Sequence, residues 1–237
     1  MLNVIIATKG LNIKKLRRCL SSITTLRNAN SINLLIVTSN VKLKSISNKY
    51  FKNITIVHDD GNGVYSAYEL GIKFSVEKYV YFLGDDDIVL NDMDIAIDKL
   101  KNLSGIDVIV CRAYMQRTNK LSSNCIFKYN LLLRNWCHQS VIYNVKIFSK
   151  YNYNLLYKIQ ADHLLNIQII NDPDLTIVQN SCTIAYFSSD GLSSKFIDKL
   201  FRRDMSSIAY NYYGYIGYFI VITRQKFMDF LNFIYNI

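Results

Sequence analysis

Three consecutive carboxylates, Asp85, Asp86 and Asp87, follow Gly84 directly after an apolar and aromatic run at positions 79–83. The run has the composition of a buried strand, and a buried strand cannot hold three adjacent charges. We therefore expect the acids at the carboxyl end of the strand, where open α/β sheets bind ligands. Carboxylate oxygens there suit Mg²⁺ or Mn²⁺ bridging the phosphates of a substrate. A solvated acidic turn is the alternative interpretation of this stretch taken by itself.

A further acid, Asp162, stands at the beginning of an apolar helical pattern that continues to Ile170. Taken alone, it is explained by the helix dipole, which favours negative charge in a first turn. His138, close to the single tryptophan, is by itself typical of a hydrogen-bonded structural residue. Gly61 and Gly63 precede another helical pattern, and such a loop either cradles a phosphate or forms an ordinary turn. The residues alone leave the roles of these groups open.

The elements that must position these groups alternate between strands and helices. Apolar runs of strand length are separated by stretches with apolar residues at helical spacing, which is typical of parallel βαβ units. We therefore predict an α/β fold with a mostly parallel sheet flanked by helices. The pattern weakens between 114 and 134, where we expect an insertion or hairpin that faces the acceptor. Strands are expected at 3–8, 32–37, 54–57, 80–83, 108–112 and 184–187, and helices at 11–26, 66–74, 91–100, 162–170 and from about residue 195.

Composition narrows the classes of protein. The chain has 237 residues, half of them hydrophobic, with one Pro and nine Gly, which fits either one large domain or one domain with a C-terminal addition. The formal net charge of +10 favours anionic partners, among them nucleic acid, sugar nucleotides and an anionic membrane face. Five Cys without CxxC spacing indicate reduced thiols. The amino-terminal residues lack the features of a signal peptide, so we expect a cytoplasmic protein.

Taken together, the sequence resembles the family 2 inverting glycosyltransferases of GT-A fold, and among them the bacterial enzymes that build O-antigen, capsule or colanic acid. The likeness spans about residues 1 to 200 and depends on the order and spacing of several blocks. It departs from the family at Ser66 and Gly84, where members carry acids, and at Thr38–Asn40, where an acid often contacts the uracil. The blocks are Asn3–Thr8, Gly63–Ala67, Gly71–Ile72, Tyr79–Asp87, Cys137–Ser140, Ala161–Asp162 and Ser189–Ser193.

The resemblance implies roles for individual residues. It implies a nucleotide-diphosphate sugar as donor, with UDP as the expected nucleotide. It implies Mn²⁺ or Mg²⁺ held by Asp87 with help from Asp86, or by Asp85 and Asp87, and Asp162 as the base that deprotonates the acceptor hydroxyl in one inverting displacement. The donor would be surrounded by Thr8, Lys9, Gly63, Val64, Tyr65, Asp85 and Asp86, and the sugar or acceptor by His138, Gln139, Asp190 and Gly191.

The expected division of the chain is a glycosyltransferase domain at 1–200 and a helical, aromatic tail at 201–237. Within the domain, 1–113 is the expected nucleotide-binding half and 114–200 the acceptor-binding half. A Tyr-rich apolar tail with basic flanks suits a membrane interface, a helix packed on the domain or a dimer contact. With the basic charge, the tail also suits a saccharide acceptor carried on a polyprenyl diphosphate at the inner face of the plasma membrane.

Other classes of protein fit parts of the pattern. A metal-dependent nucleotidyltransferase also has acids at strand ends, but no glycine-rich basic signature stands near the amino terminus here. A nucleic-acid-binding protein would present exposed aromatic residues along a basic stripe, whereas the aromatic residues here lie mostly inside apolar runs, so we expect no nucleic-acid partner. A transferase-like subunit that binds a nucleotide sugar without turnover is a further alternative.

Overall fold

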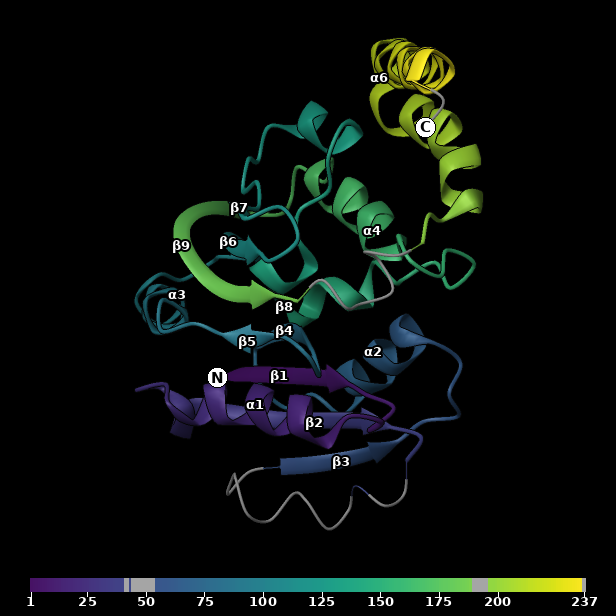
Figure 1. The fold of residues 1–237 in the computed structure, drawn as a ribbon. Coiled ribbons are helices and arrows are strands. Elements are labelled where there is room, and N and C mark those ends of the chain that lie inside the picture. Colours follow the sequence, from purple (N-terminus) through teal and green to yellow (C-terminus); the bar gives the residue numbers. More distant parts are fainter. Residues whose placement is uncertain (41–42, 44–53, 189–195, 236–237) are drawn as a thin grey trace.

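The computed structural model describes residues 1–40, 43, 54–188 and 196–235 and has the predicted α/β architecture (Figure 1). The described strands form one nine-stranded sheet in the order β3-β2-β1-β4-β8-β6-β9-β5, with β7 paired to β6. The strands are β1 (Leu2–Ala7), β2 (Ile32–Thr38), β3 (Ile54–His58), β4 (Tyr79–Gly84), β5 (Ile88–Val89), β6 (Val108–Met115), β7 (Lys120–Leu121), β8 (Val141–Asn144) and β9 (Ile177–Phe187). The α-helices are α1 (Ile13–Thr24), α2 (Val64–Lys73), α3 (Met93–Asn102), α4 (Ala161–Ile170) and α6 (Lys199–Tyr235), and the 3₁₀ helices are η1 (Ala29–Ser31), η4 (Lys128–Leu132), η5 (His138–Ser140) and η6 (Val145–Ser149).

The parallel part of the sheet, β3-β2-β1-β4, brings several strand ends to one edge. Ala7 at the end of β1 lies opposite both Val37 of β2 and Gly84 of β4. Because carboxyl ends of parallel strands share an edge, this register places the segment after β1 beside the acids that follow β4.

The second half of the chain completes the same sheet. β8 pairs antiparallel with both β4 and β6, and β9 runs parallel to β6. The predicted strand at 184–187 is the end of the longer β9, whose earlier part is interrupted in sequence by polar residues and pairs with β6 through a register shift. At its end β9 also pairs with β5, so Ser188 comes next to Asp87.

Two hydrophobic cores cover the two faces of the sheet. In β1, Ile5 faces α2 and α4, whereas Val4 and Ile6 face α1 and α3. This alternation follows from the period of two in a strand, and near-continuous apolar strands are expected when both faces are covered. The predicted helices are present with boundaries shifted by a few residues.

The expected helical tail is α6, which changes direction at Gly214, where φ is 62°. Beyond this kink the helix packs back on its own beginning, because Arg202 pairs with Asp229 at 3.0 Å and Gln225 Nε2 donates to the Arg202 carbonyl at 3.3 Å. Figure 1 shows α6 at the end of the molecule away from β3. Within the described ranges, every helix is too short or too polar to span a membrane.

Candidate active site

An open cleft of about 670 Å³ lies at the carboxyl ends of β1 and β4. Its walls also include the β6–β7 hairpin, the segment 134–139 and the beginning of α4. The cleft lining includes Asp85, Asp86 and Asp87 together with Asp162, although Asp162 stands 75 positions after Asp87 in the sequence. The hairpin expected between 114 and 134 is also part of the lining, through residues such as Met115.

Gly84 allows two of the acids to converge. A Cβ atom at this position would lie 2.6 Å from Asp87 Oδ2 and 3.1 Å from Asp86 Oδ1. A larger residue would therefore displace these carboxylates, which gives a physical reason for the glycine at this position.

Asp87 is the most buried of the three acids, with 1% of its surface exposed. Its Oδ2 accepts from the Gly84 amide at 3.1 Å and its Oδ1 from the Ser188 amide at 2.8 Å. Burial, reinforced by the charges of Asp86 and Asp85, raises the pKa of Asp87 to about 7. Strands from both halves of the chain thus fix this side chain in a position where negative charge is unfavourable without a cation.

The arrangement fits a divalent cation of the Mg²⁺ or Mn²⁺ type. Oxygens of Asp86 and Asp87 approach the same point above Gly84. Among the described residues, no three His, Cys, Asp or Glu side chains converge to enclose a metal. Two carboxylates in an open cleft match the way Mg²⁺ binds, with waters and substrate phosphates as its remaining ligands.

Thr8 and Asp85, two of the residues expected around the donor, contact each other. The Thr8 hydroxyl donates to the Asp85 carboxylate and accepts from the Gly10 amide at 2.8 Å. Burial raises the pKa of Asp85, and the Thr8 hydrogen bond opposes this shift. The part of the cleft formed by described residues includes Val64 and Tyr65, but Thr8, Lys9 and Gly63 lie outside its lining.

Asp162 lies in the first turn of α4, with 7% of its surface exposed. The Tyr65 hydroxyl donates to its Oδ1 at 2.7 Å, and Asn135 Nδ2 donates to its Oδ2 at 2.7 Å. Burial raises the pKa of Asp162 to about 6, although both hydrogen bonds favour the charged form. A carboxylate with this pKa, open to a cleft, is suited to accept a proton from a substrate near neutral pH.

His138 lines the cleft as a neutral ring. It stacks on Phe82 with centroids 4.9 Å apart and its Nε2 lies 3.0 Å from the Tyr153 hydroxyl. Burial lowers the pKa of His138 to about 3. Gln139 also lines the cleft, and its carbonyl accepts from the Tyr81 hydroxyl at 2.9 Å. The other two expected acceptor residues, Asp190 and Gly191, lie outside the described residues.

Several residues of the cleft were not predicted from the sequence. Asn135 contacts Asp162, and the basic residues Arg117, Arg134 and Lys158 line the cleft together with it. Positive charge in the same cleft as the acids after β4 favours an anionic ligand there. The only signal that could have indicated Asn135 is its position directly before the Trp136–Ser140 block.

A parallel sheet edge that carries carboxylates, facing a buried acid across an open cleft, defines the class as an α/β protein of GT-A type. The chain belongs to glycosyl transferase family 2, because the family model matches residues 3–172. This confirms the family predicted from the sequence.

Individual proteins with similar sequences are also described as glycosyltransferases. The chain is 29% identical over 159 residues to a PGL/p-HBAD biosynthesis glycosyltransferase of Mycobacterium tuberculosis (strain H37Rv), covering 62% of this chain and 60% of the relative. The same values hold for a protein of this description in Mycobacterium bovis (strain AF2122/97). This chain therefore spans less than two thirds of the length of these relatives.

Solved structures of TarS from S. aureus share the fold. Residues 1–349 of TarS in complex with UDP-GlcNAc superpose with a TM-score of 0.70 at 13% identity, covering 90% of this chain and 67% of that chain. The complex with UDP gives a TM-score of 0.68 at 14% identity, covering 90% and 66%. At such identity the likeness concerns the fold, and it confirms the GT-A prediction.

Proposed function

We propose that this protein is an inverting glycosyltransferase that transfers a sugar from a nucleotide-diphosphate sugar to a hydroxyl of a saccharide acceptor. The observation that carries this proposal is the position of Asp162 in the same cleft as Asp85, Asp86 and Asp87. The cleft holds one set of acids suited to a cation and one separate acid suited to a proton, which are the two requirements of the reaction.

The donor is proposed to be UDP-linked. TarS, which shares the fold, has been solved with UDP and with UDP-GlcNAc. In this chain the Thr8–Asp85 pair lies at the end of β1 beside the acidic loop, where a nucleoside attached to the diphosphate would fit. Val64 and Tyr65 form the neighbouring wall of the cleft.

Asp86 and Asp87 would hold Mn²⁺ or Mg²⁺. We propose Asp87 as the oriented ligand, since two backbone amides fix its carboxylate, and Asp86 as the more exposed one. When bound, such an ion neutralises the charge that develops on the departing diphosphate. Arg134 and Lys158 add positive charge in the same cleft.

Asp162 is proposed to act as the base. It removes the proton from the acceptor hydroxyl as the hydroxyl oxygen attacks the anomeric carbon, and the nucleoside diphosphate leaves from the opposite face with the bonding electron pair. A single displacement of this kind inverts the anomeric centre. His138 and Gln139 are proposed to border the sugar or acceptor, together with Asp190 and Gly191, which lie outside the described residues.

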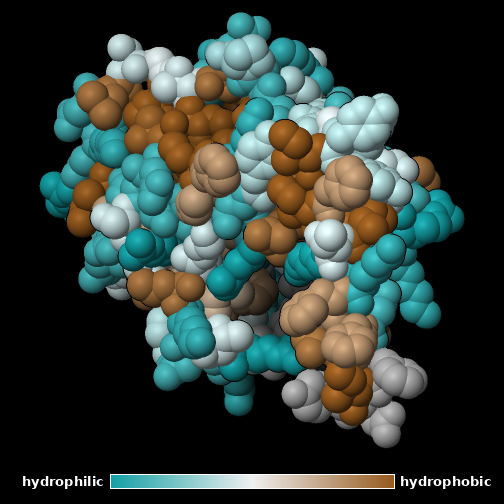
Figure 2. Space-filling model, turned by 90° about the horizontal axis from the view of Figure 1, so that it is seen from above, coloured by the Kyte–Doolittle hydropathy of each residue, from teal (hydrophilic) through white to brown (hydrophobic). Residues whose placement is uncertain are grey.

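The acceptor is proposed to be linked to a lipid diphosphate at the inner face of the plasma membrane, in bacterial surface polysaccharide synthesis such as that of O-antigen or capsule. An exposed apolar stripe on α6 supports this, because its members recur three to eight positions apart and basic residues such as Arg224 and Lys226 accompany them. Figure 2 looks onto the end of the molecule where α6 lies and shows hydrophobic side chains gathered on the surface. The stripe comprises Ile216, Phe219, Phe227, Phe230 and Ile234, each more than half exposed.

A thermal-shift panel tests the donor. We expect UDP and a UDP-sugar to raise the melting temperature in the presence of Mn²⁺ and to lose this effect with a chelator. Stabilisation by a nucleoside triphosphate alone would favour a nucleotidyltransferase, and stabilisation by an oligonucleotide would favour a nucleic-acid-binding protein. Donor binding without any transfer to lipid-linked saccharides would favour a subunit without turnover.

Vesicle flotation tests the membrane part of the proposal. Wild-type protein should float with anionic vesicles and Phe219→Glu/Phe227→Glu should not, while both keep UDP binding. The stripe is a protein contact instead if neither wild type nor the double variant floats with the vesicles. The same conclusion holds if wild type is a dimer that the double variant converts to a monomer.

A further inference from the structure

The Tyr65 hydroxyl lies between two oxygens that compete for its single hydrogen. It is 2.7 Å from Asp162 Oδ1 and 2.6 Å from the Ile159 carbonyl oxygen. A phenol donates one hydrogen bond, so it can serve only one of these acceptors at a time. If the hydroxyl donates to Asp162, the Ile159 carbonyl faces the hydroxyl oxygen without a hydrogen between them. If it donates to Ile159, Asp162 Oδ1 must carry a proton to keep a hydrogen bond with the hydroxyl.

The protonation state of Asp162 decides which arrangement is satisfied. When Asp162 is ionised, the hydroxyl donates to its carboxylate and leaves the Ile159 carbonyl without this donor. When Oδ1 carries a proton, the carboxyl group donates to the Tyr65 oxygen, and the hydroxyl is free to donate to Ile159. The geometry thus offers a matched hydrogen-bond pattern for both states of the acid.

The opposite oxygen of Asp162 is held by a chain that runs in one direction. The Tyr143 hydroxyl donates to Asn166 Oδ1 at 2.8 Å, Asn166 Nδ2 donates to Asn135 Oδ1 at 2.9 Å, and Asn135 Nδ2 donates to Asp162 Oδ2. Because each amide in this chain is oriented by the previous donor, the Asn135 side always presents a hydrogen to Oδ2. A change of protonation is therefore accommodated on the Tyr65 side.

We propose that Tyr65 is a positioning residue whose hydroxyl turns from Asp162 to the Ile159 carbonyl as Asp162 takes up the proton of the acceptor. This rests on the proposed role of Asp162 as the base. During transfer the acceptor O–H bond breaks, the new bond to the anomeric carbon forms, and the bond to the diphosphate breaks with its electron pair. The proton arrives on Oδ1, which then donates to the Tyr65 oxygen. After product release, loss of this proton to water returns the hydroxyl to Asp162.

The groups that surround Asp162 do not compete for this role. Burial lowers the pKa of His138 to about 3 and raises the pKa of Tyr68, Tyr143, Tyr153 and Cys137 above its usual range, so these side chains stay neutral between pH 5 and 8. The basic residues Arg134 and Lys158 line the same cleft, as do the acids Asp85, Asp86 and Asp87 after β4. Any titration of the acidic loop is shared by wild type and a Tyr65 variant and cancels when their pH profiles are compared.

The decisive variant is Tyr65→Phe, measured over pH 5 to 8 in saturating Mn²⁺ with the full chain. We expect kcat to fall about tenfold, because a hydrogen bond to a charged group is lost. The acid limb of the kcat profile should move up by about half a pH unit or more, because the carboxylate loses a donor, while the KM for the donor changes less than about twofold. An unchanged pH profile would reduce Tyr65 to a structural role and overturn the proposal.

Tyr79→Phe is the matched control. Tyr79 is also buried and its hydroxyl donates to a backbone carbonyl, that of Ile106, at 3.0 Å, but it lies outside the cleft lining. It should share any loss of stability but keep the wild-type profile.

A second replacement protects the test against misfolding. A 3,5-difluorotyrosine incorporated at position 65 keeps the size of the ring and makes its hydroxyl a stronger donor and a weaker acceptor. It should move the acid limb in the opposite direction, to lower pH. A shift in the same direction as Tyr65→Phe, or none, would contradict the proposal. The role of Asp162 as the base is tested independently of Tyr65, by measuring the turnover of Asp162→Asn.

Discussion

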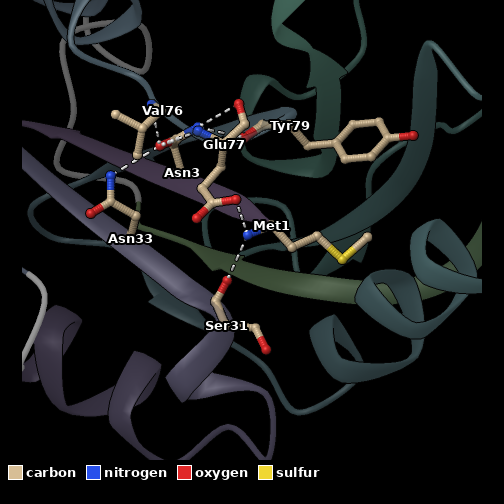
Figure 3. Close-up of polar contacts among 7 residues, drawn as sticks. All are labelled: Met1, Asn3, Ser31, Asn33, Val76, Glu77 and Tyr79. Atoms are coloured by element: carbon tan, nitrogen blue, oxygen red, sulfur yellow. Dashed lines mark hydrogen bonds and ion pairs between the residues drawn. The ribbon is translucent and has the colours of Figure 1, made fainter.

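The buried polar groups at the two ends of the parallel strands differ in charge and in how well their partners compensate them. At the amino end, Asn3 of β1 is fully buried and its amide makes hydrogen bonds in every direction (Figure 3). Its Nδ2 donates to the carbonyls of Glu77 and Tyr79, both at 3.0 Å, and its Oδ1 accepts from Asn33 Nδ2 at 3.0 Å. The amides of Val76 and Glu77 also donate to Oδ1, at 3.3 and 3.4 Å.

At the carboxyl end, the buried polar groups are carboxylates whose charge is poorly compensated. Asp87 and Asp162 both have a pKa raised by burial, to about 7 and about 6. Each accepts two hydrogen bonds that set its orientation without balancing its charge.

The difference separates stability from function. A neutral amide with all its partners ties β1 to the segment before β4, and it gains nothing from a ligand. Carboxylates kept in place against their own electrostatic preference gain from a cation or a proton, which a substrate complex supplies. Substitutions at the carboxyl end should therefore mainly change transfer activity, and substitutions at the amino end should mainly change the free energy of unfolding.

The largest effect is expected for Asp162→Asn. Loss of a general base costs about 10²- to 10⁴-fold, so single-turnover transfer should fall by this factor while UDP affinity stays within a few-fold. Asp94→Asn is the matched control, since Asp94 also lies in the first turn of a helix, α3, but accepts from the amides of Arg27 and Asn28 and lies outside the cleft lining. Turnover retained by Asp162→Asn, or lost equally by Asp94→Asn, would remove Asp162 as the base.

A smaller loss, about 10²-fold in transfer, is expected for Asp86→Asn through weaker cation binding. The concentration of Mn²⁺ that gives half-maximal stabilisation by UDP should rise at least about tenfold. Asp87→Asn should show the same loss together with lower stability of the apo protein, since an amide cannot accept from both Gly84 and Ser188 as the carboxylate does. If a chelator leaves UDP affinity of wild type unchanged, the metal assignment is wrong for both residues.

These two predictions depend on parts of the molecule that differ in how well the sequence indicates them. The sheet edge and the acidic loop were predictable, because apolar strands of regular length end in charges that must leave the core. The contact of Asn135 with Asp162 joins an irregular segment to a helix and has no periodic signal. The Ser188 contact to Asp87 uses a backbone amide 101 residues away, which no side-chain pattern records. The family resemblance places Tyr65 around the donor, but no pattern in the sequence indicates that its hydroxyl donates to Asp162.

At the amino end, Asn3→Ala should lower the free energy of unfolding by about 3 kcal/mol, because buried backbone groups lose their partners. Activity per folded molecule should not change. Asn33→Ala removes only one of the partners of Asn3 and should cost about 1 kcal/mol or less. Urea denaturation with parallel transfer assays measures both quantities. A loss of kcat in folded Asn3→Ala would show that the two ends are coupled.

The smallest effect is the dependence of these variants on pH. The folded pKa of Asp162 is raised from 3.8 to about 6, because folding buries a carboxylate that is already charged in the unfolded chain at neutral pH, and this burial is unfavourable. The favourable contribution of its neutral form is fully present below pH 3.8 and is lost as pH rises through about 6. Asp162→Asn should therefore become more stable relative to wild type by about 1 kcal/mol between pH 5 and pH 7. Asn3 cannot ionise, so the destabilisation by Asn3→Ala should be the same at both pH values. Urea denaturation at pH 5 and pH 7 distinguishes the two ends. If the difference in stability between Asp162→Asn and wild type does not depend on pH, Asp162 is charged in the folded protein at both pH values. That result would exclude the raised pKa that makes Asp162 a base near neutral pH.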